Sequence, residues 1–203
     1  MLTMRQNGNL WHNTWNAENR LISTYSDTAG KKLEFAYDFM GRRVEKKVYT
    51  GSSTTSWTLS SHERFVYDIY KLIEKLDATS SNAVQQKFLW QPSAVGFDIS
   101  LLITDTANSA TYYYFADANK NIGKLADSSG NTVSKYEYSP FGKVNQFGTY
   151  TTNLLQFSSE YHDKESNLVY YNYIYYSPEL GRWTKRDPIG EFIKHSKHSF
   201  LYI

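Results

Sequence analysis

The chain has 203 residues, of which 40% are hydrophobic and 17% aromatic, with 18 tyrosines, no cysteine and a formal net charge of +2 at pH 7. Tyrosine and tryptophan supply enough apolar area to exclude a disordered chain, and the lack of cysteine excludes disulfides, thiolate metal sites and cysteine catalysis. The longest apolar stretches, such as Phe97 to Ile103, are far shorter than the roughly 18 residues of a membrane span, and the small net charge argues against nucleic acid as a partner.

A short pattern recurs along the chain and predicts a series of β-hairpins. It consists of an aromatic residue, then Asp, Asn or Ser, variable residues, Gly or Asn, a basic residue and an apolar residue. The polar residue starts a turn, Gly or Asn accepts a left-handed backbone, and the basic side chain can lie over an aromatic ring. We expect Gly41, Gly142 and Gly181 to be turn residues of this kind. The copies are Trp15–Leu21, Tyr37–Val44, Tyr67–Leu72, Tyr138–Val144 and Tyr176–Trp183.

Between these turns the pattern of side chains predicts strands. Polar and apolar residues alternate in Val44–Tyr49 and in Thr132–Tyr138, which is typical of half-buried strands. The Ser/Thr-rich segments Thr50–Ser61 and Ala78–Ala83 are interpreted as long hairpin loops. Tyr70–Ala78 is the best candidate for a helix, although it is short. A repeat period near 20 residues favours units that bury their faces on their neighbours. The predicted fold is all-β, with consecutive antiparallel hairpins in a curved sheet.

Two later segments resemble a known family. Tyr112–Val144 combines an aromatic run, two polar turns (the second at Asp127–Asn131) and a Tyr-x-Tyr-x-Pro-Phe-Gly strand end. Tyr161–Gly190 is rich in tyrosine and ends in Gly-Arg-Trp and Arg-Asp-Pro-Ile-Gly. These segments resemble the core region of the RHS/YD-repeat family, and the preceding half resembles its degenerate YD repeats. The resemblance implies hairpin repeats over residues 1–111, a core-like region over 112–190 and a truncated basic tail over 191–203.

The resemblance also implies an architecture and a candidate site. Members of this family build a long β-ribbon that spirals into a hollow shell, which in bacteria encloses a toxin, and the core closes one end. In many members the core cuts the chain with an Asp of Arg-Asp-Pro-x-Gly and a partner Asp in a second such element. Arg186 and Asp187 match the first element, and Pro188 and Gly190 shape its turn. No second Asp-Pro occurs in this sequence, and one carboxylate cannot divide acid and base roles, so we expect no autoproteolysis.

The function predicted first is therefore structural: a part of an RHS/YD-repeat shell, secreted by a bacterium or held at its surface. Its expected partners are upstream YD repeats or further copies of the chain, with a toxin or a glycan as cargo or ligand. One alternative is a self-cleaving aspartyl protease core with Asp187 as the acid/base residue. Another is an adhesin that binds glycans through exposed aromatic residues such as Trp57 and Trp183, although we expect Trp183 to be buried.

Other polar groups favour ordinary structural roles. The run Asp117-x-Asn119-x-Asn121 lacks the glycine and the acidic residue of a calcium loop and is interpreted as a polar turn. His195 and His198 lack a third ligand for zinc and belong to the basic tail. Glu160, Asp163 and Glu165 could form a glycosidase pair, but their context favours turn and surface positions. The sequence predicts no metal and no cofactor.

Overall fold

The computed structural model describes residues 2–92 and 98–185 of the chain. Within them, thirteen antiparallel strands form one sheet in which each strand pairs with its neighbours in the sequence. We call this sheet the wall. Its strands are β1 (Thr3–Gln6), β2 (Asn9–Trp15), β3 (Leu21–Ser26), β4 (Lys31–Tyr37), β5 (Arg43–Gly51), β6 (Trp57–Asp68), β7 (Lys71–Asp77), β8 (Ala83–Trp90), β9 (Ser100–Asp105), β10 (Ala110–Ala116), β11 (Ile122–Ala126), β12 (Thr132–Tyr138) and β13 (Val144–Gly148).

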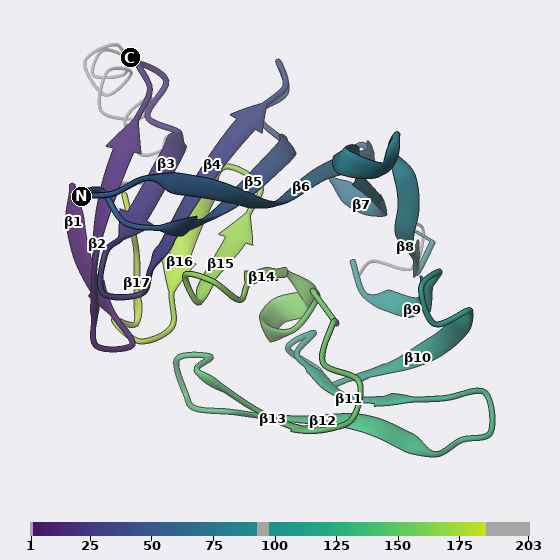
Figure 1. Cartoon of the computed structure of the whole chain (residues 1–203). Helices are drawn as coiled ribbons and strands as arrows, with labels where there is room; N and C mark the ends of the chain where they lie inside the picture. The colour runs from purple at the N-terminus through teal and green to yellow at the C-terminus, as the bar shows by residue number, and fades with distance from the viewer. Residues whose placement is uncertain (1, 93–97, 186–203) are drawn as a thin grey trace, which may run out of the picture.

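The wall curves into an open arc, and a second, smaller sheet lies inside it (Figure 1). We call this four-stranded antiparallel sheet the inner sheet. It follows the short 3₁₀ helix η3 (Phe157–Ser159) and consists of β14 (Tyr161–Asp163), β15 (Leu168–Tyr171), β16 (Ile174–Ser177) and β17 (Arg182–Trp183). The prediction of an all-β fold built from consecutive hairpins is confirmed.

Every copy of the recurring pattern connects two paired strands. The copies form the β2–β3, β4–β5, β6–β7, β12–β13 and β16–β17 connections. The backbone φ angles of Gly41, Gly142 and Gly181 are +83°, +83° and +60°, in the left-handed region that a side chain disfavours.

Two details of the secondary structure differ from the sequence interpretation. Tyr70–Ala78 is not a helix, because Lys71–Asp77 pairs as β7 with the strands on both sides, and only Ala78–Ser80 forms a 3₁₀ turn, η1. The loop predicted over Thr50–Ser61 is shorter than expected. Trp57–Ser61 belongs to β6 and pairs with β5, because threonine and tryptophan fit a pleated strand as well as a loop.

In the first three copies of the pattern, the basic residue links its turn to the next connection along the same rim of the wall. The guanidinium groups of Arg20 and Arg42 lie over the rings of Tyr37 and Tyr67, 5.8 and 5.7 Å from the ring centres. These two groups and the Lys71 ammonium donate hydrogen bonds to carbonyls of the following connection: Arg20 to Asp38, Arg42 to Ile69, and Lys71 to Gln91. The prediction that the basic residue lies over an aromatic ring is confirmed for Arg20 and Arg42, and the carbonyl contacts add a connection between successive hairpins.

In three copies of the pattern, and at Trp90 at the end of β8, the aromatic residue makes a second connection between hairpins. It donates from its ring hydroxyl or ring nitrogen to a carbonyl near the start of an earlier strand of the wall. This bond explains why the position takes Tyr or Trp rather than Phe, since only these rings carry a donor. The bonds are Tyr37 to Leu21 (2.6 Å), Tyr67 to Arg43 (3.0 Å), Trp90 to Leu72 (2.7 Å) and Tyr138 to Ile122 (2.8 Å).

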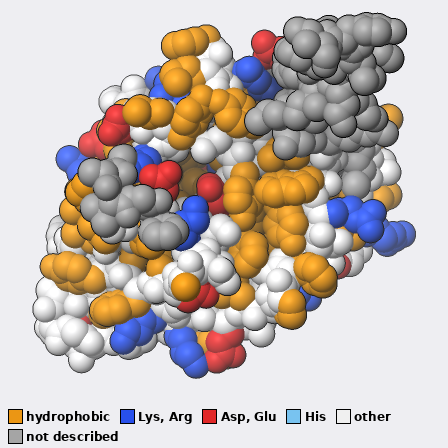
Figure 2. Space-filling model, turned by 180° about the vertical axis from the view of Figure 1, so that it is seen from behind, with side chains coloured by type: hydrophobic (Ala, Val, Ile, Leu, Met, Phe, Trp, Pro, Cys, Tyr) orange, Lys and Arg blue, Asp and Glu red, His pale blue; other side chains and the backbone are white. Residues whose placement is uncertain are grey.

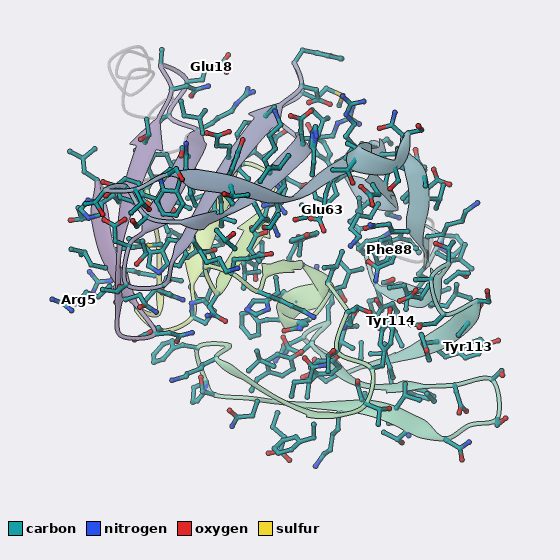
Figure 3. The ribbon with its side chains drawn as sticks, viewed as in Figure 1. Arg5, Glu18, Glu63, Phe88, Tyr113 and Tyr114 are labelled. Atoms are coloured by element: carbon teal, nitrogen blue, oxygen red, sulfur yellow. The ribbon has the colours of Figure 1, made fainter. Side chains whose placement is uncertain are left out.

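The hydrophobic core lies between the concave face of the wall and the inner sheet. Alternate residues of each strand point into the arc, so Phe88 and Tyr114 are buried there while Tyr113 points away (Figure 3). Apolar side chains also lie in several groups on the rear surface (Figure 2). Among all the described residues, the most exposed large hydrophobic side chain is Phe39, at the tip of the β4–β5 turn.

Two further observations bear on the sequence predictions. Among residues 2–92 and 98–185, the structure contains no helix of the length and hydrophobicity that crossing a membrane requires. The proposed boundary between residues 111 and 112 falls inside β10, which continues the wall without a break. The division into three regions stays a prediction.

Candidate functional site at the junction of the two sheets

A buried ion pair joins the wall to the inner sheet. Arg43 opens β5 directly after the Gly41–Arg42 turn, and the alternation of the strand directs its side chain into the arc. Its Nη1 lies 2.5 Å from Oδ2 of Asp163 in β14, and neither side chain is exposed to solvent. The two residues are 120 positions apart in the sequence. The pair therefore fixes how the last quarter of the described chain sits on the first.

Aromatic rings surround the guanidinium group of Arg43. Its central carbon lies between 4.4 and 5.9 Å from five ring centres, with Tyr161 and Tyr170 of the inner sheet nearest. The Tyr175 hydroxyl also accepts from Nη1 at 3.2 Å. Cation–π contacts of this kind are strongest where water is excluded, as it is here. The rings thus stabilise a charge that burial alone would make costly. The five rings belong to Phe35, Phe65, Tyr161, Tyr170 and Tyr175.

Lys46 extends the ion pair into a network of alternating charges. Its Nζ lies 3.0 Å from Oδ1 of Asp163 and 2.8 Å from Oε2 of Glu165. It also lies 3.8 Å from Glu63, which binds Lys75 at 3.2 Å. Figure 3 shows Glu63 on β6 with its side chain directed into the arc. Four segments of the chain thereby contribute charges to one centre.

The charges in this network remain ionised because each has partners. Burial alone would raise the pKa of Asp163, but the positive charges of Arg43 and Lys46 outweigh it and the pKa is lowered. Burial would likewise raise the pKa of Glu63, but the positive charges of Lys46 and Lys75 outweigh it and the pKa is lowered. Burial by itself would lower the pKa of Lys46, yet its aromatic and acidic neighbours raise it.

This pairing decides what the centre can do chemically. Asp163 and Glu165 both bind the same lysine, so they do not form the free acid and base that glycosidase chemistry requires. Asp163 is also fully buried, which contradicts the expected surface position. The sequence His162–Asp163–Lys164 is typical of a surface segment. Inside the protein, however, Arg43 and Lys46 of β5 compensate the charge of the Asp163 carboxylate. The centre holds two sheets together.

Two further sets of hydrogen bonds connect the same C-terminal quarter to the first hairpin of the wall and to β9. In the first hairpin, the Gln6 side chain donates to the carbonyl of Asn167 at 2.9 Å and accepts from Ser177 at 2.6 Å. Towards the other end, the Tyr150 hydroxyl donates to Asp105 of β9 at 2.9 Å. The C-terminal quarter of the described chain therefore contacts β1, β5 and β9 of the wall.

The sequence-predicted catalytic residues lie elsewhere. Arg186, Asp187, Pro188 and Gly190 fall outside the described residues, as do His195 and His198. The carboxylate of Asp117 accepts hydrogen bonds from the backbone of Asn119 and from Asn121, which is the geometry of a polar turn. The described part of the chain brings together no group of three or more His, Asp or Glu side chains arranged to hold a metal ion.

Trp183 is not buried, which corrects the expectation from the sequence. It is 45% exposed because it lies on β17, at an edge of the inner sheet. The rings of Tyr171 and Tyr176 meet the Trp183 ring edge-on, with their ring centres 4.9 and 5.2 Å from its centre. An aromatic surface is therefore present at this edge.

Glu160 and His162 flank Tyr161, and their ionisation affects stability in opposite directions. Burial raises the pKa of Glu160 to about 7 and lowers that of His162 to about 4. The folded state therefore holds the Glu160 proton more tightly than the unfolded chain, so this residue destabilises the fold as pH rises from 4.5 towards 7. His162 is held neutral, so it destabilises the fold as pH falls from 6.5 towards 4.

We expect these two effects to offset each other in the intact chain between pH 4.5 and 6.5. Glu160→Gln should leave a free energy of unfolding that falls as pH drops from 6.5, by up to about 1.4 kcal/mol per pH unit. His162→Gln should leave one that falls as pH rises from 4.5 towards 7. Urea denaturation of both variants between pH 4 and 8 measures this, and parallel pH profiles for the two would contradict it.

Comparison with known proteins supports a repeat shell. The family model described as teneurin YD-shell matches residues 2–199. The chain is 26% identical over 179 residues to the tRNA3(Ser)-specific nuclease WapA of Bacillus spizizenii, covering 86% of this chain and 7% of that protein. It is 24% identical over 193 residues to the double-stranded DNA deaminase toxin A of Burkholderia cenocepacia, covering 87% of this chain and 14% of that protein. The chain thus spans a small part of these relatives.

Solved structures show the same fold. The crystal structure of TcdB2-TccC3 matches with a TM-score of 0.62 at 19% identity, over 88% of this chain and 9% of that one. The Tc holotoxin pore of Photorhabdus luminescens matches with a TM-score of 0.63 at 19% identity, over 89% of this chain and 9% of that one. The arc of hairpins is therefore an arrangement that also occurs within much longer chains.

Proposed function

The chain belongs to the teneurin YD-shell family of RHS/YD-repeat proteins, and we propose that it forms the part of a hollow shell at which the ribbon ends and the interior is closed. Its role in this proposal is to enclose or present another polypeptide, such as a toxin, outside the bacterial cell. The observation that carries the proposal is the buried ionic centre of Arg43 and Asp163, which fixes the inner sheet on the concave face of the wall.

Among the strands that the structure describes, β1 pairs with β2 alone, and this edge gives the proposal a testable consequence. Leu2 and Asn13 share a backbone hydrogen bond, and bonding alternates along an antiparallel pair, so the N–H and C=O of Arg5 point away from β2. Arg5 also lies at the outer side of the arc in Figure 3. An unpaired edge accepts a further strand, which in a longer shell is an upstream repeat and in the isolated chain is a second copy.

We expect the isolated chain to self-associate through β1. Sedimentation velocity should show dimers or larger species at micromolar concentrations, and Arg5→Pro should shift them to monomer because proline removes the edge N–H. Arg5→Ala keeps that N–H and is the matched control. A chain that is monomeric, highly soluble and cooperative in melting would contradict the proposal.

Self-cleavage and glycan binding are separate candidate functions with separate tests. Intact-mass measurement of the chain, compared with Asp187→Asn, detects autoproteolysis, and an unbroken 203-residue mass in both supports the structural role. Glycan binding is favoured by the exposed aromatic edge at Trp183, Tyr171 and Tyr176. A glycan-array signal that is lost in Trp183→Ala, with the melting transition retained, would support it, and Trp57→Ala tests the second expected tryptophan.

A further inference from the structure

The last strand of the wall, β13, has a free side towards the interior of the molecule. In the described residues it pairs with β12 alone. Lys143 and Thr149, at either end of the strand, both hydrogen-bond through the backbone to the β12 side. Since bonding alternates along an antiparallel pair, Val144 and Gln146 direct their N–H and C=O groups to the free side.

Two adjoining cavities follow this free side. They share Val144, His162 and Asn167, so together they form one groove between β13 and the β14–β15 hairpin. The larger cavity has a volume of about 340 Å³, and the smaller one, towards the first hairpin of the wall, about 50 Å³. The larger is also lined by Gln146, Thr151, Gln156 and Lys164. We call this feature the β13 groove.

Buried polar atoms in the β13 groove lack partners. Nδ1 of His162 and Oε1 of Gln156 have no hydrogen bond among the described residues, although the two side chains are only 8% and 2% exposed. Buried polar groups in folded proteins are almost always paired, so unpaired ones that line a cavity indicate where another molecule's polar groups bind. One is an acceptor, and the imidazole can act as donor or acceptor.

The charges around the groove are mainly positive. Lys143 lines the smaller cavity and Lys164 the larger one, and both side chains are exposed. Within the described residues neither forms an ion pair, whereas the nearby acids Asp163 and Glu165 are already bound to Lys46. Glu179, at the far end of the smaller cavity, accepts from the backbone of Asn7. The unpaired lysines therefore favour a negatively charged occupant.

We propose that the β13 groove binds an extended acidic segment of another polypeptide, which adds to the wall as a strand beside β13. An added strand would satisfy the backbone groups of Val144 and Gln146 while its alternate side chains reach Lys143, Lys164 and the buried polar atoms. A small anion or a free sugar would leave the edge of β13 unpaired. The proposal does not depend on the chain being part of a shell, since it rests on the edge of β13 and on the side chains that line the groove.

The test uses the full 203-residue chain and two fluorescein-labelled peptides of alternating sequence, TVEVEVT and TVKVKVT. Anisotropy titrations should show the acidic peptide binding at least tenfold more tightly than the basic one. Gln146→Pro removes the edge N–H and should weaken binding of the acidic peptide at least tenfold. Gln146→Ala keeps the N–H and is the matched control, so its affinity for the acidic peptide should stay within threefold of that of the unmodified chain. Equal binding by the Pro and Ala variants, or no binding of either peptide to the unmodified chain, would overturn the proposal.

A charge exchange and a measurement on the unmodified chain keep the proposal open to refutation even if the proline variant misfolds. The double variant Lys143→Glu/Lys164→Glu should reverse the preference in favour of TVKVKVT, and an unchanged preference would overturn it. In the unmodified chain, the amides of Val144 and Gln146 should exchange with deuterium rapidly and slow at least tenfold when TVEVEVT is added. If these amides exchange slowly before the peptide is added, the edge of β13 is already occupied, by residues 186–203 or by a second copy of the chain. That result would also overturn the proposal.

Discussion

Replacing Arg43 by methionine should lower the free energy of unfolding by about 3–5 kcal/mol, because it leaves the carboxylate of Asp163 buried with part of its charge compensation removed. The substitution also removes the cation that five aromatic rings surround, while the methionine side chain retains much of the packing volume. Urea denaturation at pH 7, followed by tryptophan fluorescence, measures the change.

A double-mutant cycle separates the ion pair from the loss of packing. Arg43→Met combined with Asp163→Leu should cost at least about 1–3 kcal/mol less than the sum of the two single changes, since the double variant leaves neither member of the pair behind. The control is Lys135→Met, which breaks the exposed pair with Glu137 and should cost less than about 1 kcal/mol. If Arg43→Met and Lys135→Met cost the same, the ionic centre does not stabilise the junction.

Replacing Gly142 by alanine should destabilise the fold by about 2–4 kcal/mol, because the new methyl group would enter the ring of Phe157 and the backbone is left-handed. An ideal Cβ at this glycine lies 2.7 Å from Phe157 Cδ1 and Cγ, and φ is +83°. The ring cannot easily move away, since it packs against Tyr138 and Tyr176.

Gly130 provides a matched control for this substitution. Its φ is +84°, but a Cβ there would meet nothing within 4 Å. Gly130→Ala should therefore cost only the backbone strain, about 1 kcal/mol. Thermal and urea unfolding of the two variants compares them directly. Equal losses would show that the contact with Phe157 does not matter and that conformation alone makes Gly142 necessary.

The hairpins could be predicted from sequence because their causes are local. A turn at Asp38–Gly41 needs a polar residue to start it and a glycine to close it, and both stand within four positions of each other. The alternation in Thr132–Tyr138 likewise identified a strand with the observed bounds. Where local signals were ambiguous, pairing decided the outcome: Lys71–Asp77 became a strand because β6 and β8 lie on either side of it.

The ionic centre could not be predicted because its partners are distant in the sequence. The residue of the pattern that matches Arg20 is Arg42, and both bind at the rim. Arg43 follows at the position that Leu21 holds in the first copy, yet it carries a charge and is buried. What distinguishes these two positions is that the carboxylate of Asp163 lies opposite β5, and periodicity specifies which face a side chain occupies without specifying its partner. The local sign is that Arg43 follows Arg42 directly and begins a half-buried strand. A charged side chain on the buried face of a strand needs a carboxylate to compensate it.

The pairing of each strand with its sequence neighbours has a consequence for how the chain is made. Contacts within the wall are short in sequence, so its hairpins can assemble one after another as they leave the ribosome. Arg43 must then wait for about 120 further residues to be synthesised before its carboxylate arrives. Until that moment the concave face of the wall lacks the inner sheet, so we expect the final quarter of the described chain to complete the hydrophobic core.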